Sequence, residues 1–160
     1  MAFSDRLGGG KTIVQLKDNS RITFKGSCII SKGCKIIINE RASIEFGDCT
    51  FLNANTIVNS GSSIVIGHHF LAGWNVCIID GDGHDIIDIK TMKTINSYRP
   101  IKIGNHCWAS AHSTILKGVA LADNTIIPYG SIISKSSDEE NCIFGGNPNK
   151  ILKKQIKRHE

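Results

Sequence analysis

Aliphatic residues recur at every sixth position over the second half of the chain. From Ile103 the sequence reads IGNHCW-ASAHST-ILKGVA-LADNTI-IPYGSI-ISKSSD, and each unit opens on an aliphatic residue or alanine. In the first five units a small or β-branched residue follows four positions after the opener. These residues are Cys107, Ser113, Val119, Thr125 and Ser131. A period of six fits neither a helix nor a simple strand, whose side chains repeat every 3.6 and 2 residues, so each unit is predicted to be one short strand and one turn.

Three such units close a triangular coil of about 18 residues, and stacked coils pair as parallel strands about 4.8 Å apart. The same period appears upstream as FGDCTF-LNANTI-VNSGSS and IGHHFL-AGWNVC, whereas the stretch before Ile44 has no clean register. Glycine and asparagine suit the corners because both tolerate positive φ. An antiparallel sandwich also has many short strands, but it does not require a small residue at a constant offset. The sequence therefore predicts an all-β fold, a parallel β-solenoid.

The repeat stops at the stretch IIDGDGHDIID, residues 78–88, where four aspartates and a histidine interrupt the aliphatic pattern. Residues from Asp80 to Pro100 are polar and keep no six-residue period. We expect them to form a loop extruded from a corner of the solenoid. Insertions of this kind project from one edge and commonly carry function.

Charge and composition exclude some classes of protein. The 160 residues contain 19 Lys and Arg against 14 Asp and Glu. Five of these basic residues and one glutamate lie in the segment 147–160, so the rest of the chain is almost neutral. A uniformly basic surface for nucleic acid is not expected. No run reaches the roughly 18 apolar residues of a membrane span, and the N-terminus lacks a signal-peptide stretch, so the expected compartment is the cytoplasm.

The six cysteines show no zinc-site spacing and no CxxC pair. Each lies in an apolar, strand-like stretch, so we expect reduced thiols that pack as small core side chains. They are Cys28, Cys34, Cys49, Cys77, Cys107 and Cys142.

Three motifs, IKIGNHCWASAHSTILKGV, DGDGH and GGNPNKIL, carry a family resemblance. On these residues the chain resembles the hexapeptide-repeat acyltransferases and looks closest to sugar and polysaccharide O-acetyltransferases related to the maltose and galactoside enzymes. The resemblance covers roughly residues 43–153. It implies a left-handed parallel β-helix, assembled as a homotrimer with each active site between two subunits. The handedness rests on the resemblance, because the general rule for parallel crossovers favours the right-handed form.

Several positions depart from that family pattern. The maltose and galactoside enzymes carry a helical N-terminal segment, whereas here a short Gly-rich lead precedes the repeats. Ala109 and Ser110 replace a usual Ile-Gly pair, Pro128 replaces a usual glycine, and acidic residues occupy 138–140, where prolines are frequent. The missing helical segment favours the shorter enzymes that act on surface polysaccharide or its precursors.

The resemblance also implies site residues for acetyl transfer. His84, in the extruded loop, matches the catalytic histidine, and an imidazole can act as a general base near neutral pH. Asp80, Asp82 or Asp85 is expected to orient its ring, and the sequence does not choose among them. Asn53 matches an asparagine that holds the acceptor hydroxyl, although a corner asparagine is also ordinary in a β-helix.

For the oxyanion, the resemblance implies the backbone amide of Ala111, a position that requires only a small side chain. Trp108, in the same motif, is expected to wall the pantetheine channel, with packing as the alternative. Trp74, just before the loop, is expected either to stack on a sugar ring or to pack in the core or an interface.

The co-substrate predicted by the resemblance is acetyl-CoA, without a metal. Tyr129 and Ser134 occupy family positions that contact the pantetheine and adenine ends. Lys150 and Lys153 would bind the phosphates as point charges. The alternative for this basic segment is a solvated amphipathic helix docked through its aliphatic residues, and both roles are compatible.

Two other classes of protein share features with this sequence. Zinc-dependent carbonic anhydrases share this fold, and His69, His106 and His112 each follow a unit opener by three residues. However, these are corner positions, and no nearby carboxylate for a zinc-bound water is evident. A non-catalytic binding solenoid would not need a histidine in so long an insertion.

The sequence thus predicts a β-helix domain over residues 1–146 and a basic C-terminal helix or tail over 147–160. The predicted activity is acetyl transfer from acetyl-CoA to a hydroxyl of a carbohydrate through a ternary complex, because no nucleophilic Cys or Ser with a partnered base occurs at the motif. Transfer to the nitrogen of an amino sugar is the alternative. The sequence does not identify the sugar.

Overall fold

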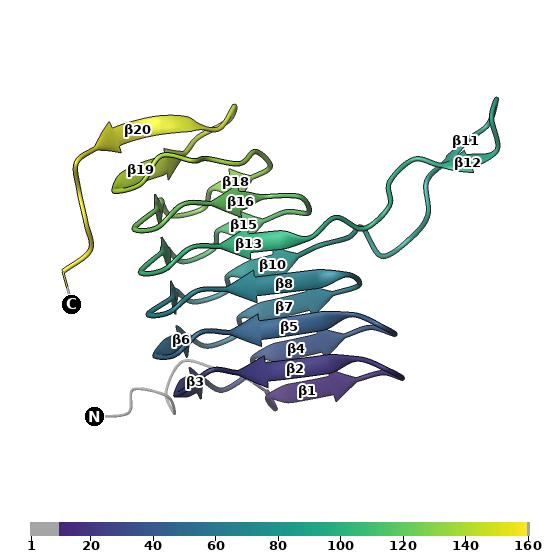
Figure 1. Cartoon of the computed structure of the whole chain (residues 1–160), viewed down its shortest axis with the longest axis horizontal. Helices are drawn as coiled ribbons and strands as arrows, with labels where there is room; N and C mark the ends of the chain where they lie inside the picture. Colours follow the sequence, from purple (N-terminus) through teal and green to yellow (C-terminus); the bar gives the residue numbers. More distant parts are fainter. Residues whose placement is uncertain (1–9, 160) are drawn as a thin grey trace.

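A computed structural model describes residues 10–159, and within that range the chain forms strands β1 to β20 and no helix (Figure 1). The strands wind into a column of stacked triangular coils, and an arm projects from one corner. The parallel β-solenoid predicted from the six-residue period is confirmed. None of the described residues belongs to a helix long and apolar enough to span a membrane.

The column has three faces, each a sheet of parallel strands. Face A consists of β1 (Ile13–Leu16), β4 (Lys35–Ile38), β7 (Ile57–Ser60), β10 (Cys77–Ile79), β15 (Thr114–Ile115) and β18 (Ile132–Ile133). Face B consists of β2 (Arg21–Phe24), β5 (Ser43–Phe46), β8 (Ser63–Ile66), β13 (Ile101–Ile103) and β16 (Ala120–Leu121). Face C consists of β3 (Cys28–Ile30), β6 (Thr50–Leu52), β9 (Leu71–Ala72), β14 (Trp108–Ala109), β17 (Ile126–Ile127), β19 (Cys142–Gly145) and the antiparallel β20 (Lys150–Lys154).

Aliphatic side chains stack in register along the inside of each face. On face A the ladder runs through Ile36, Val58, Ile78, Ile115 and Ile133, and all five are completely buried. Each buried side chain of this size contributes about 1.5–3 kcal/mol relative to an exposed one. These ladders form the core of the column.

The small residues inside the corners have a hydrogen-bonding role as well as a steric one. Ser113 Oγ donates to the carbonyl of Ser110 at 2.6 Å, and Thr125 Oγ1 donates to the carbonyl of Ala122 at 2.8 Å. Both residues are fully buried. At these two corners a short hydroxyl side chain supplies a donor to a carbonyl where the chain turns.

Along face A, coil length decreases toward the C-terminus in steps of two residues. Ile36 pairs with Val58, 22 residues later; Val58 pairs with Ile78, 20 later; and Ile115 pairs with Ile133, 18 later. A step of two keeps each side chain on its own side of the strand. Because the N-terminal coils are longer than 18 residues, the six-residue register is not visible before Ile44.

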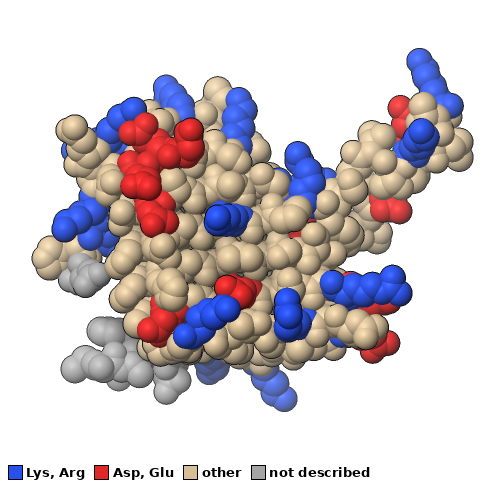
Figure 2. Space-filling model, viewed as in Figure 1, with Lys and Arg blue, Asp and Glu red and all other residues tan. Residues whose placement is uncertain are grey.

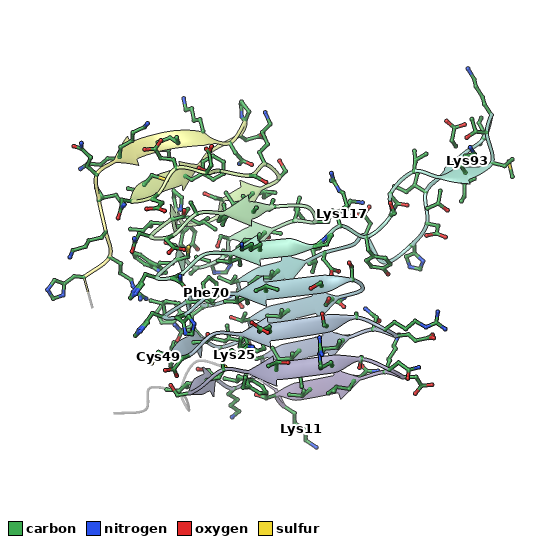
Figure 3. All side chains as sticks on the ribbon, in the orientation of Figure 1. Lys11, Lys25, Cys49, Phe70, Lys93 and Lys117 are labelled. Atoms are coloured by element: carbon green, nitrogen blue, oxygen red, sulfur yellow. The ribbon has the colours of Figure 1, made fainter. Side chains whose placement is uncertain are left out.

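The arm leaves the column between β10 and β13 and ends in the antiparallel hairpin of β11 (Ile87–Asp88) and β12 (Lys93–Thr94) (Figure 1). Figure 3 places Lys93 at the far end of the arm and Lys117 where the arm leaves the column. Three aliphatic or methionine side chains near its tip are largely exposed: Ile89 by 87%, Met92 by 75% and Ile95 by 64%.

The predicted C-terminal helix is wrong, because residues Lys150–Lys154 form strand β20. It pairs antiparallel with β19, and the register shifts between Ile143 and Phe144. The open edge of β19 offers unpaired backbone groups, and the bulge accommodates the consecutive Ile151 and Leu152. The following residues turn back along the column, where Arg158 Nη2 donates to the carbonyl of His69 at 2.9 Å.

Basic and acidic side chains are interspersed on the face of the molecule in Figure 2, and acidic side chains gather near its C-terminal strands. On the part of the surface shown there, the described residues form no continuous basic area.

Candidate active site

The structure distributes the predicted catalytic residues over two different corners of the column. Asn53 lies between β6 and β7, and Ala111 lies between β14 and β15, both at the corner that joins faces C and A. His84 follows β10 on the arm, at the corner that joins faces A and B. One chain therefore does not bring His84 together with Asn53 and Ala111.

At the first of these corners Trp74, Ala111 and Tyr129 occupy equivalent positions in successive coils. His112 N donates to the carbonyl of Trp74 at 2.8 Å, and Gly130 N donates to the carbonyl of Ala111 at 3.0 Å. Trp74 is 49% exposed and Tyr129 is 70% exposed. Two aromatic side chains thus flank Ala111 along an accessible edge.

The amide of Ala111 has no acceptor among the described residues. A Cβ added to Gly73 would lie 2.5 Å from this nitrogen. The equivalent residues of the neighbouring coils are Asn53 and Ser110, so glycine is not required by the coil itself at this position. The missing side chain at Gly73 leaves the N–H of Ala111 open, as an oxyanion donor requires.

A polar group that the sequence reading missed lies beside this amide. Asn75 Nδ2 and His112 Nε2 are 3.3 Å apart, and the rings of His112 and Tyr129 have centroids 5.2 Å apart. The sequence pattern indicates His112 only as a candidate metal ligand. Its contact with Tyr129 arises from coil stacking, which places residues 17 positions apart side by side.

Asn53 is partly committed to the fold. Its Nδ2 donates to the carbonyl of Ala72 at 3.1 Å, and its own carbonyl accepts from Thr56 Oγ1 at 2.7 Å. The side-chain oxygen has no partner in the described part of the chain. This oxygen can accept a hydrogen bond from a hydroxyl group.

The residues predicted to hold coenzyme A lie near the C-terminal end of the column. Asn149 Oδ1 accepts from the amide of Ser134 at 2.8 Å, and its Nδ2 donates to the carbonyl of Ile132 at 2.7 Å. Asn149 thereby caps the open edge of β18 and holds Ser134 close to Lys150, the next residue along the chain. Lys150 and Lys153 are both exposed.

Trp108 lies on the outer surface of face C. It pairs with Leu71 on one side and with Ile126 on the other, and Phe51 continues the same ladder through Leu71. These outward-facing apolar side chains are only half-buried. Trp108 is therefore a wall residue of face C and not part of the core.

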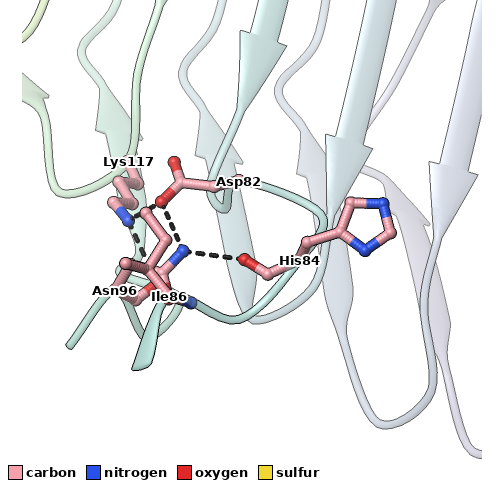
Figure 4. Close-up of polar contacts among 5 residues, drawn as sticks. All are labelled: Asp82, His84, Ile86, Asn96 and Lys117. Atoms are coloured by element: carbon pink, nitrogen blue, oxygen red, sulfur yellow. Dashed lines mark hydrogen bonds and ion pairs between the residues drawn. The ribbon is translucent and has the colours of Figure 1, made fainter. Parts of the chain in front are cut away.

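The arm holds His84 through its backbone. Asn96 Nδ2 donates to the carbonyl of His84 and to Asp82 Oδ2, both at 2.8 Å, and Asn96 Oδ1 accepts from the amide of Ile86 at 2.7 Å (Figure 4). Lys117, from the column, donates to Asp82 Oδ2 and to the carbonyl of Asn96. This arm-base cluster of Asp82, Asn96 and Lys117 fixes the chain on both sides of His84.

The imidazole of His84 points away from this cluster (Figure 4). It is exposed and has no hydrogen-bond partner in the described part of the chain. Asp82 is occupied by Lys117 and Asn96. The hydrogen bond from Lys117, followed by that from Asn96, lowers the pKa of this carboxyl, so it is an anion at neutral pH.

Asp80 is also occupied, at the point where the arm begins. Its carboxylate is completely buried and accepts from Gly61 N at 2.7 Å, Ser60 Oγ at 2.8 Å and Ser62 N at 2.9 Å. Asp80 and Asp82 therefore anchor the arm and do not bind the His84 ring, and Asp85 makes no such contact with the other residues of 10–159.

The cysteines are all free thiols. Burial raises the pKa of Cys107, beside Trp108, to about 12, and its Sγ donates to the carbonyl of Ala122 at 3.2 Å. A thiol with so high a pKa forms almost no thiolate at neutral pH and is a poor nucleophile.

Two of the three histidines weighed as metal ligands stack face to face. The rings of His69 and His106 have centroids 4.5 Å apart and lie nearly parallel, with an interplanar angle of 5°. His112 lies at a different corner. Among residues 10–159, no three His, Cys, Asp or Glu side chains converge as a metal site would require.

Comparison with known proteins gives the class of this molecule. No family model matches the sequence. The chain is nevertheless 34% identical over 143 residues to the polysialic acid O-acetyltransferase of Escherichia coli, which covers 89% of this chain and 43% of that protein. The chain thus spans less than half the length of this relative.

Solved structures give the same result for the fold. The crystal structure of a polysialic-acid-specific acetyltransferase superposes with a TM-score of 0.73 and 26% identity, over 94% of this chain and 82% of that one. A galactoside acetyltransferase in complex with coenzyme A gives a TM-score of 0.63 and 22% identity, over 85% and 64% of the two chains. These findings confirm the predicted fold class, a left-handed parallel β-helix, and the predicted resemblance: the homologues of this chain are hexapeptide-repeat O-acetyltransferases.

Proposed function

We propose that this protein is a coenzyme A-dependent O-acyltransferase that transfers an acetyl group from acetyl-CoA to a hydroxyl of a sugar or surface-polysaccharide precursor in the cytoplasm. The observation that carries the proposal is an exposed imidazole and an open backbone amide on one β-helix. Both groups lie in a chain that is homologous to an O-acetyltransferase over most of this chain's own length.

The chemistry follows from these two groups. His84 removes the proton of the acceptor hydroxyl as its oxygen attacks the thioester carbonyl carbon. The carbonyl oxygen becomes an oxyanion, to which the N–H of Ala111 donates a hydrogen bond; one such donor is worth about 3 kcal/mol in the transition state. Collapse of the tetrahedral intermediate breaks the C–S bond, and the imidazolium returns its proton to the departing thiolate.

Direct transfer is favoured over an acyl-enzyme. Cys107, the thiol within the motif IKIGNHCWASAHSTILKGV, stays protonated because burial raises its pKa to about 12. No Ser or Cys at the motif has a base in contact, so acetyl-CoA and acceptor must be bound together.

The active site requires two copies of the chain, since His84 and the Ala111 corner are separated in one copy. We propose the homotrimer of the family, in which the arm of one copy reaches the corner of faces C and A on the next. The exposed apolar tip of the arm and the half-buried apolar ladder on face C support this arrangement, because exposed apolar surface of this kind favours association.

For the co-substrate, we propose that Trp108 and Tyr129 flank the pantetheine arm and that Ser134 lies near the adenine end. Lys150 and Lys153 would contact the phosphates. Asn53 would hold the acceptor hydroxyl through its free side-chain oxygen, and no metal takes part.

The test is release of free thiol from acetyl-CoA with a panel of glycans, nucleotide sugars and amino sugars. His84→Ala should reduce the rate by two to four orders of magnitude with unchanged thermal unfolding, and His68→Ala, an exposed histidine at another corner, should be neutral. An unchanged rate in His84→Ala would exclude this residue as the base. Amino sugars that react while every sugar without an amine is inert would favour N-acetyl transfer.

Subunit complementation tests the shared site. Neither His84→Ala nor Asn53→Ala should be active alone, but co-refolded mixtures should regain about a quarter of the wild-type rate, because one interface in four pairs an intact His84 with an intact Asn53. Mixtures that stay inactive would place both residues in one copy's site.

A further inference from the structure

A small hollow lies between the base of the arm and face A. It has a volume of about 120 Å³ and is lined by Asn39, Asn59, Asp80, Gly81, Gly83 and Tyr98. A second hollow, of about 30 Å³, is lined by His84 and shares Gly83 and Tyr98 with the first. The larger hollow therefore opens beside the proposed base.

Two asparagine side chains supply polar groups to this hollow. Asn39 Nδ2 donates to Asn59 Oδ1 and to the carbonyl of Ser60, both at 3.0 Å. This leaves Asn39 Oδ1 and Asn59 Nδ2 without a partner in the described part of the chain. Both side chains are half-buried and held by their mutual hydrogen bond. The hollow thus contains one fixed acceptor and one fixed donor.

Tyr98 forms an aromatic wall whose position is fixed by two glycines. A Cβ added to Gly61 or to Gly81 would lie 2.1 Å from its ring. The ring therefore occupies space that only glycine leaves at both positions, and 45% of the residue remains exposed.

These features fit a sugar ring better than other ligands. Amide donors and acceptors bind hydroxyl groups, and an aromatic ring can pack on the apolar face of a pyranose. A hollow of about 120 Å³ can hold one side of a sugar residue but not a nucleotide. The buried carboxylate of Asp80 in the wall disfavours an anionic group, so a face carrying only hydroxyls should enter.

We propose that this hollow, on the same copy as His84, is a subsite for one pyranose unit of the acceptor. Asn39 and Asn59 would bind its hydroxyls, and Tyr98 would pack on its ring. The subsite would hold the sugar beside the imidazole, while the neighbouring copy supplies Ala111 and coenzyme A. The inference rests on the proposed function for the nature of its ligand.

The test uses the intact protein, without acetyl-CoA, titrated with galactose, glucose, N-acetylgalactosamine and N-acetylneuraminic acid. Side-chain amide signals of Asn39 and Asn59 in ¹H–¹⁵N spectra should shift with at least one of these sugars. Asn59→Ala should abolish the shift of Asn39 and raise KM for the acceptor about tenfold, with KM for acetyl-CoA unchanged. Tyr98→Phe should retain binding because the ring is kept. Thr23→Ala, an outward-facing polar residue on face B, is the matched control and should leave both KM values unchanged.

Two outcomes overturn the subsite. One is acetyl transfer to a sugar with no shift at Asn39 or Asn59; the other is an acceptor KM that Asn59→Ala leaves unchanged. Either result would leave the acyltransferase function intact. Sugar-induced shifts at these two amides without any acetyl transfer would instead support the subsite and contradict the proposed reaction.

Discussion

Asp80 is the residue through which the fold sets the position of the arm, and its replacement gives a quantitative test. Three donors converge on its carboxylate, from Ser60, Gly61 and Ser62, at 2.7–2.9 Å, and the residue is completely buried. Asp80→Ala leaves the amides of Gly61 and Ser62 without an acceptor, whereas the hydroxyl of Ser60 can still donate to the carbonyl of Ser43 at 3.1 Å. Each buried group left unpaired costs about 1–3 kcal/mol, and water entering the space vacated by the carboxylate offsets part of this.

We therefore expect Asp80→Ala to lower the free energy of unfolding by about 2–5 kcal/mol, because two buried amides lose their acceptor. Asp80→Asn keeps one acceptor oxygen but sets an N–H against a donor, so about 1–3 kcal/mol is expected. Urea unfolding followed by far-UV circular dichroism measures both. Hydrogen exchange should show that the amides of Gly61 and Ser62 lose protection.

Asp85→Asn is the matched control, because this aspartate is exposed on the same arm. It should change the free energy of unfolding by less than about 0.5 kcal/mol. An Asp80→Ala protein as stable as this control would show that the three hydrogen bonds do not hold the base of the arm.

Four further predictions concern the arm, the proposed oxyanion amide and the thiols. Lys117→Met should lower the rate of acetyl transfer and raise the amide hydrogen-exchange rates of the arm, whereas Lys117→Arg should keep both at the wild-type level. Equal exchange rates in the two variants would contradict the anchoring role of Lys117. Because the pKa of Asp82 is lowered in the folded state, its stabilising contribution is fully present above its pKa in the unfolded chain, about 3.9, and is lost as the pH falls through the lower folded-state pKa. The amide hydrogen-exchange rates of the arm, corrected for intrinsic rates, should therefore be constant from pH 5 to 8. Faster corrected exchange at any pH within that range would refute this role of Asp82. Gly73→Ala places a Cβ 2.5 Å from the proposed oxyanion amide, so kcat should fall at least tenfold while acetyl-CoA binding, measured by calorimetry, changes less. A thiol reagent at pH 8 should label exposed Cys49 in the native protein and reach Cys107 only after unfolding, because burial raises the pKa of Cys107 to about 12; early labelling of Cys107 would contradict its burial.

The regular part of the fold could be predicted from the sequence because each six-residue unit is self-contained. From Ile103 onward the aliphatic opener, the small residue and the corner repeat without interruption, and the structure stacks them as expected. Before Ile44 the coils are longer, so the period changes from coil to coil and a search for a constant register fails.

The C-terminal segment shows the limit of local patterns. Ile151, Leu152 and Ile156 fit one side of a helix, but the edge of β19 is open and nearby. Pairing with that edge satisfies backbone groups that a helix would leave exposed on β19. No property of residues 147–160 alone reveals that edge.

The site residues that belong to a local motif could be predicted from the sequence. Those that the fold brings together from distant positions could not. The DGDGH motif identified the loop of His84, but the two aspartates before it anchor the arm. The partners of Asp82 are Asn96 and Lys117, which lie 14 and 35 residues beyond it. Only the return of the arm and the stacking of the next coil bring them together.

The coil lengths of 22, 20 and 18 residues have a consequence for how such a column can vary. An extra residue within a strand would turn the rest of that strand inside out, so coils of different length differ at their corners. Insertions of any length, odd or even, can be accommodated only at the corners, and this protein carries its arm at one of them.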